Sequence, residues 1–260
     1  MVPNLISPFF SRLVDYINRA LTKRKYRMLF YATDYDPLQE QDLVILAEQQ
    51  KVEGIICLSY NPDLKVSENV PLVSIDRYFG AQIPCVASDN YSGGRLAAEK
   101  LVENGCRNLA FMRIGSRLTN EPNKRKDGFV NACEAMNIPY TLKIVEDGSP
   151  YSAFEQFLQE HMSEGKLAFD GIFCVTDSLA HQIINSLKNM GIRVPEDVQI
   201  IGFDGAQYFG DLEYYCSTIV QPLEDIAETC VSIVLQEQPS RLASLVCLPV
   251  HYAYGGTTRR

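Results

Sequence analysis

Acidic residues stand directly after three apolar runs in this sequence. The runs are "PLVSIDR", which ends at Asp76 and Arg77, "GIFCVTD", which ends at Thr176 and Asp177, and "VQIIGFDG", which contains Asp204. Ligands of open α/β sheets bind beyond the carboxyl ends of the strands. Carboxylates accept hydrogen bonds from pairs of hydroxyl groups, and arginine donates in a fork. These side chains therefore predict a binding site for a small polyol, and a sugar fits best.

Two adjacent aromatic residues, Phe9 and Phe10, could complete such a site, because aromatic rings pack against the apolar C–H faces of sugars. They follow Ser7 and Pro8, which are typical of the N-cap and the first position of a helix. Each candidate also has a purely structural interpretation. Phe9 and Phe10 could both belong to the core. Asp204, which precedes Gly205, could be a turn residue, and Thr176 or Asp177 could be the N-cap of the following helix. Asp76 and Arg77 could form an ion pair on the surface.

The elements that must position these residues alternate along the chain. Apolar runs predict strands at residues 27–33, 54–59, 71–76, 108–114, 142–146, 171–176, 198–203 and 244–254. Helical periodicity predicts helices at residues 7–21, 36–50, 90–105, 124–137, 152–162, 177–191 and 222–236. This alternation predicts an α/β fold with parallel sheets and helices on both faces.

A short internal sequence similarity indicates that the chain consists of two similar halves. "VEGIIC" at Val52 is matched by "FDGIFC" at Phe169, and each is followed by a second apolar strand that ends in an acid, Asp76 or Asp204. We interpret this similarity as two similar α/β lobes whose strand ends face one cleft.

Composition excludes several function classes. The net charge is −8 and the isoelectric point about 5.0, which argues against direct nucleic-acid binding by this chain. No apolar run approaches the ~18 residues of a membrane span, and no secretion signal is visible. The eight cysteines, several within apolar runs, predict buried reduced thiols in a cytoplasmic protein.

Catalysis, cofactors and metals have little support in the sequence. His161, His181 and His251 are far apart, so no zinc site is expected, and no nucleotide-binding or nucleophile motif occurs. We therefore expect no enzyme activity and no cofactor. "SGGR" at 92–95 leaves two interpretations open, a phosphate cradle at a helix start or close packing of that helix.

Several motifs together resemble the effector-binding region of LacI/GalR transcriptional regulators. They are "VPNLISPFF", "VEGIICLS", "PLVSIDR", "SDNYSGGRLAAEKLVENGCRNLAF", "KRKDGF", "GIFCVTDSLA", "GIRVPEDVQIIGFDG" and "STIVQPLEDIAE". The resemblance covers nearly the whole chain. It implies a periplasmic-binding-protein-like fold in which two Rossmann-like lobes are joined by three crossovers, near Gly115, Gln221 and Arg241.

The resemblance also implies domain bounds, partners and site residues. The first lobe would comprise residues 1–115 and 222–241, and the second 116–221 and 242–260. A homodimer is expected, to which the first lobe contributes the helix in "NYSGGRLAAEKL". The implied ligand positions are Ser7 (where Asn is common), Phe9, Phe10, Asp76, Arg77, Arg125, Thr176 (where Asn is usual), Asp177, Asp204 and Gln221.

The implied function is a sugar-sensing and dimerisation region of a repressor of carbohydrate metabolism. The family's helix-turn-helix is not seen in this sequence, which starts within the family's first strand, so we expect a piece of a longer regulator that contacts operator DNA only through an N-terminal domain. A transport-associated sugar-binding protein is the main alternative, and an α/β enzyme is the weaker one.

Overall fold

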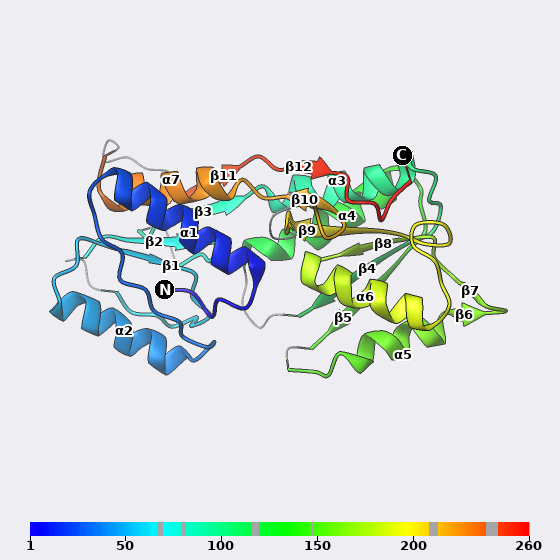
Figure 1. Cartoon of the computed structure of the whole chain (residues 1–260), viewed down its shortest axis with the longest axis horizontal. Helices are drawn as coiled ribbons and strands as arrows, with labels where there is room; N and C mark the ends of the chain where they lie inside the picture. The colour runs from blue at the N-terminus through cyan, green and yellow to red at the C-terminus, as the bar shows by residue number, and fades with distance from the viewer. Residues whose placement is uncertain are drawn as a thin grey trace. The chain divides into compact units, whose positions relative to one another are not determined.

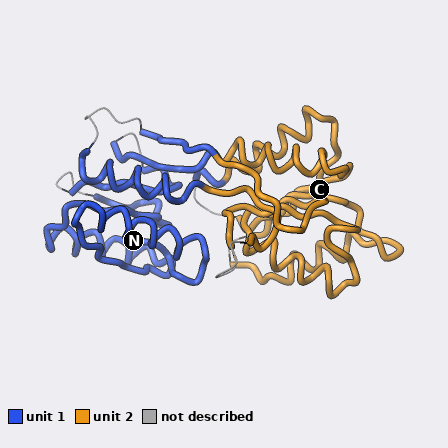
Figure 2. Tube along the Cα trace, turned by 45° about the horizontal axis from the view of Figure 1, so that its top comes forward, with its two compact units in different colours: residues 1–89, 118–122, 222–249 blue, residues 90–117, 123–221, 250–260 orange. Residues whose placement is uncertain are grey.

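A computed structural model describes residues 1–66, 70–79, 82–115, 120–146, 148–207, 213–237 and 244–259 (Figure 1). The chain forms two compact units (Figure 2). Unit 1 comprises Met1–Asp89, Leu118–Pro122 and Pro222–Pro249, and unit 2 comprises Asn90–Arg117, Asn123–Gln221 and Val250–Arg260. None of the helices in the described ranges is long and apolar enough to cross a membrane.

Unit 1 contains a parallel four-stranded sheet in the order β1-β2-β3-β11. The strands are β1 (Ile55–Cys57), β2 (Leu72–Ile75), β3 (Cys85–Ser88) and β11 (Leu245–Leu248). One face packs against α1 (Pro8–Lys23) and α7 (Leu223–Val234), and the other packs against α2 (Pro37–Gln49). Both faces are therefore apolar, as expected for a parallel sheet that helices cover on both sides.

Unit 2 contains a six-stranded sheet in the order β12-β10-β9-β8-β4-β5, in which only β12 is antiparallel. The strands are β4 (Leu109–Ile114), β5 (Tyr140–Val145), β8 (Gly171–Cys174), β9 (Gln199–Asp204), β10 (Ser217–Val220) and β12 (His251–Ala253). Helices α3 (Asn90–Glu103) and α4 (Lys124–Ala135) lie on one face, and α5 (Ser152–Glu160) and α6 (Asp177–Asn189) lie on the other (Figure 1). A short 3-10 helix, Glu121–Asn123, precedes α4, and β6 (Met162–Ser163) pairs with β7 (Lys166–Leu167).

The predicted lobe boundaries are wrong at two places. Residues 90–115, expected in the first lobe, belong to unit 2, because α3 packs against α4 and β4 pairs with β5 and β8. The helix expected to bring the first lobe into a dimer therefore lies in unit 2. Residues 244–249, expected in the second lobe, belong to unit 1, because β11 pairs with β3.

The unit boundaries can be compared with the three expected crossovers. The chain passes between the units at Gln221 and Pro222, as predicted. The first passage lies between Asp89 and Asn90, earlier than any crossover expected, and the chain enters unit 1 again at Leu118, close to the crossover expected near Gly115. The position expected near Arg241 lies outside the described residues, and the final passage is at Pro249 and Val250.

Most predicted elements are present, with two exceptions. Residues 27–33, expected to form a strand, make a single parallel bridge between Val2 and Ala32. The long strand expected at 244–254 is two strands, β11 and β12, which belong to different sheets. The N-cap of α2 is Asp36, which accepts from the backbone N–H groups of Leu38 and Gln39. Ser7 is the N-cap residue of α1, but its side chain makes no capping bond.

The cysteines are free thiols, and seven of the eight are buried. Burial raises the pKa of Cys57 and of Cys85 to about 12, so these thiols stay protonated. Cys247 is exposed, contrary to the expectation that all are buried, because it lies on β11 at the edge of its sheet.

Candidate functional site

The two similar segments form equivalent pieces of structure. In unit 1, β1 pairs in parallel with β2, and in unit 2, β8 pairs in parallel with β9. Asp76 follows β2 directly and Asp204 ends β9, as the sequence predicts. Both acids have a positive φ, 58° for Asp76 and 125° for Asp204, which is uncommon for residues other than glycine. Strained backbone of this kind clusters at functional sites.

Asp204 is the centre of a polar cluster in unit 2. Its Oδ1 accepts a hydrogen bond of 2.8 Å from Gln221 Nε2 and lies 3.7 Å from Arg125 Nη1. The side chain of Asp204 is 12% exposed, and that of Arg125 only 4%. Gly205, with φ 76°, then turns the chain away from the strand. Three predicted site residues thus meet at one carboxylate that keeps some contact with solvent.

Arg125 is held rigidly from several directions. Its Nε donates to Asn90 Oδ1 at 2.7 Å, and its Nη1 donates to the backbone oxygen of Val175 at 2.6 Å. Its guanidinium carbon lies 3.6 Å from the centroid of the Phe203 ring. Hydrogen bonds from a charged donor and stacking on an aromatic ring both favour guanidinium over other cations. Arg125 therefore presents a fixed positive charge beside Asp204.

Glycines let helices α3 and α4 come close enough to position Arg125. A Cβ atom on Gly94 would collide with the backbone oxygen of Arg125, and one on Gly128 would collide with that of Tyr91. A Cβ atom on Gly93 would lie 2.6 Å from the Phe203 ring. The glycines of "SGGR" thus support the close-packing interpretation of this segment.

Thr176 and Asp177 have roles within unit 2. Thr176 is the N-cap of α6 and accepts from the backbone N–H of Leu179. Asp177 is buried, and its two oxygens accept from Thr218 Oγ1 at 2.7 Å and from the backbone N–H of Ala206 at 2.6 Å. These contacts favour the structural interpretation of both residues over the predicted ligand contact.

The environment of Asp177 disfavours its charged form. Burial, and secondarily the nearby charge of Asp204, raise the pKa of Asp177 well above its usual value. Hydrogen bonds from Thr218 and Ala206 oppose this shift. Asp177 and Asp204 are therefore two carboxyl groups whose environments differ, one enclosed and the other paired with an arginine.

The strand-end residues of unit 1 are also enclosed. Asp76 and Arg77 are both buried, so the surface ion pair considered as an alternative is wrong. The guanidinium carbon of Arg77 lies 4.6 Å from the centroid of the Tyr60 ring. The backbone oxygen of Asp76 accepts a hydrogen bond from the backbone N–H of Glu121. The backbones of Arg77 and Asn120 form an isolated antiparallel β-bridge. Segment 120–122 thus packs against the end of β2.

Sequence reasoning missed Glu40, which organises the loop after β1. This carboxylate is buried, and it accepts from the hydroxyl of Ser59 and from the backbone N–H groups of Tyr60 and Asn61 at 3.1 Å. It thereby holds Tyr60 where Arg77 can stack on it. Glu40 lies in the first turn of α2, where an acid is ordinarily favoured by the helix dipole, so the sequence pattern carries no sign of this role.

The aromatic pair divides between two roles. Phe10 is buried in the core beneath α1, which is the structural interpretation rather than the predicted ligand contact. Phe9 is partly buried, and its ring meets that of Phe10 edge to face at 5.5 Å. Ser7 is also partly buried. In the described ranges of the chain, no group of His, Cys, Asp and Glu could hold a metal ion.

Comparison with known families identifies the fold. A profile of the periplasmic binding protein-like domain matches residues 98–258, more than half of the chain. The chain belongs to this family. Among solved structures, a periplasmic binding protein/LacI transcriptional regulator from Alkaliphilus metalliredigens, complexed with D-xylulofuranose, is 27% identical with a TM-score of 0.81. The match covers 100% of this chain and 98% of that one.

Similar members of the periplasmic-binding-protein-like family include named repressors. The sucrose operon repressor of Streptococcus mutans is 30% identical, over 90% of this chain and 72% of the repressor. The ribose operon repressor of Bacillus subtilis is 28% identical, over 100% of this chain and 80% of the repressor. The resemblance to the effector-binding region of LacI/GalR regulators is confirmed, and the named relatives are transcriptional repressors rather than enzymes.

Proposed function

We propose that this chain is the effector-sensing and dimerisation region of a LacI/GalR-type transcriptional repressor, and that its effector is a small sugar. The observation that carries the proposal is the Asp204 carboxylate, which Gln221 and Arg125 hold in place at a strand end while part of it stays exposed. A carboxylate fixed in this way accepts hydrogen bonds from neighbouring hydroxyl groups without first being reorganised. The relatives named for sucrose and ribose operons support a sugar rather than another polyol.

The remaining contacts are assigned by the chemistry of each side chain. Arg125 supplies positive charge beside Asp204. Within unit 1, Arg77 is stacked on Tyr60 and is the guanidinium group of that unit's own polar cluster. Phe9, which is only partly buried, supplies an aromatic ring for an apolar sugar face. The predicted contacts from Phe10 and Asp177 are not part of the proposal, since both are enclosed by the protein.

Effector binding is proposed to act through a change of population. A sugar that binds one arrangement of a homodimer more tightly than another shifts the equilibrium between them, and DNA affinity follows that equilibrium. With a net charge of −8, the chain is poorly suited to hold DNA by itself. We assign DNA contact to another domain of the regulator, and we assign the regulator to the cytoplasm, where operator DNA is found.

Calorimetric titration tests the proposal directly. D-Ribose, sucrose, D-xylulose and cellobiose would be titrated into the wild-type chain, Asp204→Ala and a matched control, Asp197→Ala. Asp197 is an aspartate paired with Arg193 on the surface. At least one sugar should bind the wild type and the control, and Asp204→Ala should lose that binding. Equal binding by all three proteins, or binding of none of the sugars, would contradict the proposal.

A double-mutant cycle tests whether unit 1 and unit 2 residues serve the same effector. Arg77→Gln, Asp204→Asn and the double variant would be compared by their binding free energies for the same sugar. Residues that contact one ligand are expected to show non-additive effects. If only one of the two clusters serves the sugar, the single variant in the other cluster will leave the binding free energy unchanged. Sedimentation equilibrium of the same proteins tests the proposed homodimer separately.

A further inference from the structure

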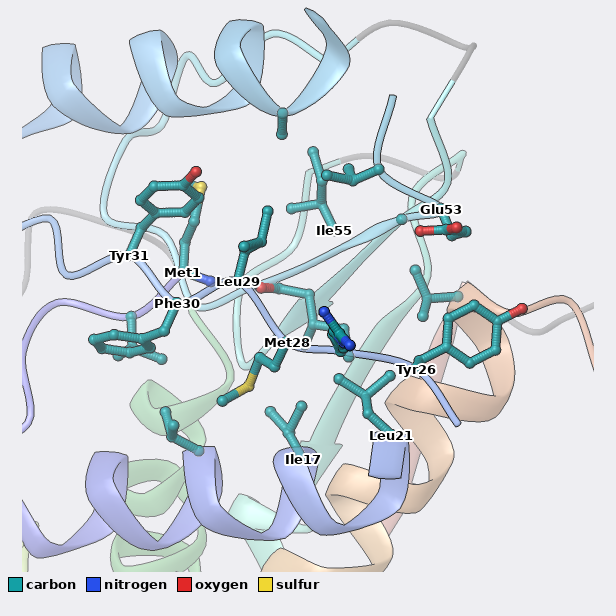
Figure 3. A pocket seen from close by; sticks show the side chains of 18 of the residues that line it. Met1, Ile17, Leu21, Tyr26, Met28, Leu29, Phe30, Tyr31, Glu53 and Ile55 are labelled. Carbon is teal, nitrogen blue, oxygen red and sulfur yellow. Dashed lines mark hydrogen bonds between the residues drawn. The ribbon is translucent and has the colours of Figure 1, made fainter. Parts of the chain in front are cut away.

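Unit 1 contains an apolar cavity of about 170 Å³ (Figure 3). The described residues that line it are mainly apolar, such as Ile17, Leu21 and Met28, and include none of the residues that we propose to bind a sugar. A small polar ligand is oriented by a few precisely placed polar groups. Affinity for a sugar therefore depends on how firmly the polar groups elsewhere are held, above all the carboxylate of Asp204.

The backbone at Asp204 departs from the regular geometry of β9. Side chains of a strand alternate between its two faces. A Cβ atom on Gly202 would collide with Asp177, at the start of α6, whereas the ring of Phe203 lies against Arg125 of α4. Regular alternation would direct Asp204 back toward α6. With φ at 125°, its carboxylate reaches Arg125 instead.

The turn after Asp204 is held by the carboxyl group of Asp177. A positive φ is costly for a residue other than glycine and persists only where its surroundings hold it. Asp177 Oδ2 accepts from the backbone N–H of Ala206 at 2.6 Å, and Oδ1 accepts from Thr218 Oγ1 at 2.7 Å. Thr218 Oγ1 in turn accepts from the backbone N–H of Gly205 at 3.3 Å. The two N–H groups that follow Asp204 are thus tied to one carboxyl group, one directly and the other through a hydroxyl.

The two glycines of "GFDG" leave room for this arrangement. Gly202 lies opposite Thr218 in the sheet, and a Cβ atom there would collide with Asp177 Oδ1. Gly205 has a φ of 76°, and a Cβ atom there would lie 2.8 Å from Val220 Cγ1. The first glycine therefore admits the carboxyl group of Asp177 against β9, and the second lets the turn pass close to β10.

Asp177 is itself held in place, because it is buried and begins α6, whose apolar residues belong to the core of unit 2. Two residues earlier, the backbone oxygen of Val175 accepts from Arg125 Nη1 at 2.6 Å. Residues 175–177 therefore support both sides of the polar cluster, namely Arg125 and the turn at Asp204.

We propose that Asp177 is a positioning residue for sugar recognition, which acts through the backbone of residues 204–206 and does not touch the sugar. This inference rests on the proposed function, in which Asp204 accepts hydrogen bonds from the sugar. With Asp177 in place, the carboxylate of Asp204 is directed toward Arg125 before the sugar binds, so binding does not have to order it. Without Asp177, the turn relaxes toward regular strand geometry, and the sugar must restore the orientation.

A matched control separates this role from a contribution to stability alone. Asp170 also accepts from two backbone N–H groups, those of Arg107 and Asn108, but it lies at the opposite end of β8 from Asp177. Asp177→Ala and Asp170→Ala therefore remove the same kind of contact within unit 2. Only the first of these contacts supports the turn that carries Asp204.

Calorimetric titration with D-ribose, sucrose, D-xylulose and cellobiose compares these variants with the wild type. Asp177→Ala should weaken sugar binding roughly 10-fold or more, because the carboxylate of Asp204 must then be ordered on binding. Asp170→Ala should leave the affinity unchanged. Asp177→Asn should restore binding to within about threefold of the wild type, because its oxygen can accept from Ala206 while its amide donates to Thr218.

Thr218→Val tests the same link if Asp177→Ala does not fold. It removes the hydroxyl that joins Asp177 to the N–H of Gly205 and keeps a side chain of similar shape. Sugar binding should weaken roughly threefold or more, and Thr218→Ser, which retains the hydroxyl, should bind as the wild type does. Without sugar, amide hydrogen exchange at Ala206 should be faster in Asp177→Ala than in the wild type or in Asp170→Ala.

Two outcomes would overturn this inference and leave the proposed function intact. One is a folded Asp177→Ala variant that binds the sugar as tightly as the wild type does. The other is an equal loss of affinity in Asp177→Ala and Asp170→Ala, which would show that both residues act only through the stability of unit 2. If the wild type binds none of the four sugars, the proposed function fails, and the role of Asp177 in sugar recognition fails with it.

Discussion

Replacement of Asp204 tests the description of the unit 2 cluster, because two substitutions remove different parts of it. Asp204→Asn keeps an oxygen that accepts from Gln221 and removes the charge that lies 3.7 Å from Arg125. Asp204→Ala removes both interactions. In either variant Arg125 keeps its bonds to Asn90 and to the backbone of Val175.

The expected magnitudes follow from these contacts. At an effective dielectric constant of about 20, opposite charges at this separation attract by roughly 4–5 kcal/mol before desolvation is counted. Desolvation offsets part of this attraction, and removing the charge also relieves the repulsion that raises the pKa of Asp177. We expect Asp204→Asn to lower the free energy of unfolding by about 1–2 kcal/mol. Asp204→Ala should cost about 1–3 kcal/mol more, because buried Gln221 then loses this hydrogen bond as well.

Urea unfolding at constant pH measures both values, and sugar titration of the same proteins measures binding. Loss of a charged hydrogen-bond acceptor is expected to weaken sugar binding by roughly 10- to 150-fold in the Asn variant. The reasoning is refuted if Asp204→Asn costs the full attraction of 4–5 kcal/mol, or if the Asn and Ala variants are equally stable. It is also refuted if the folded Asn variant binds the sugar as tightly as the wild type.

Three further changes test other parts of the structure. Because the pKa of Asp177 is raised in the folded state, the folded protein holds this proton more tightly than the unfolded chain does. The free energy of unfolding should therefore fall as pH rises from the unfolded pKa of 3.8 toward the folded pKa. Asp177→Asn should flatten this dependence in urea unfolding measured from pH 4 to 8. Gly94→Ala should lower the free energy of unfolding by more than about 3 kcal/mol, because its Cβ atom meets the backbone of Arg125, and an unchanged Tm would contradict the packing described. Glu228→Gln, which removes the charge of a partly buried partner of Arg24, should cost at most about 1 kcal/mol. A cost that persists in 1 M salt would show that the contribution is not electrostatic.

The periodicity of the sequence was sufficient to predict most helices and strands, because helices and strands have different local periods. Pro37 after Asp36, and Gly105 after α3, mark helix ends through backbone preferences that depend on neighbouring residues alone. The division between the units was harder to predict. Residues 90–115 and 244–249 were assigned to the wrong lobe, because which sheet a strand joins depends on pairing with residues far away in the sequence.

The residues of the candidate site also fall into those that the local sequence predicted and those that it did not. The sequence placed Asp76 and Asp204 at strand ends, and the positions of Arg125 and Gln221 followed from motifs. The sequence did not distinguish the exposed edge of Asp204 from the enclosed carboxyl of Asp177, because their surroundings come from separate elements. It also missed Glu40, whose partners lie about twenty residues away in the loop after β1.

By itself, the sequence determined the alternation of elements, the strand-end acids and the family, since all of these depend on local order along the chain. Only the tertiary structure decided which side chains enclose one another. It placed Phe10 in the core, stacked Arg77 on Tyr60, and left residues 27–33 without a strand ladder although their composition favours one. The physical reason is that a strand forms only when a partner satisfies its backbone hydrogen bonds, and that partner is specified elsewhere in the fold.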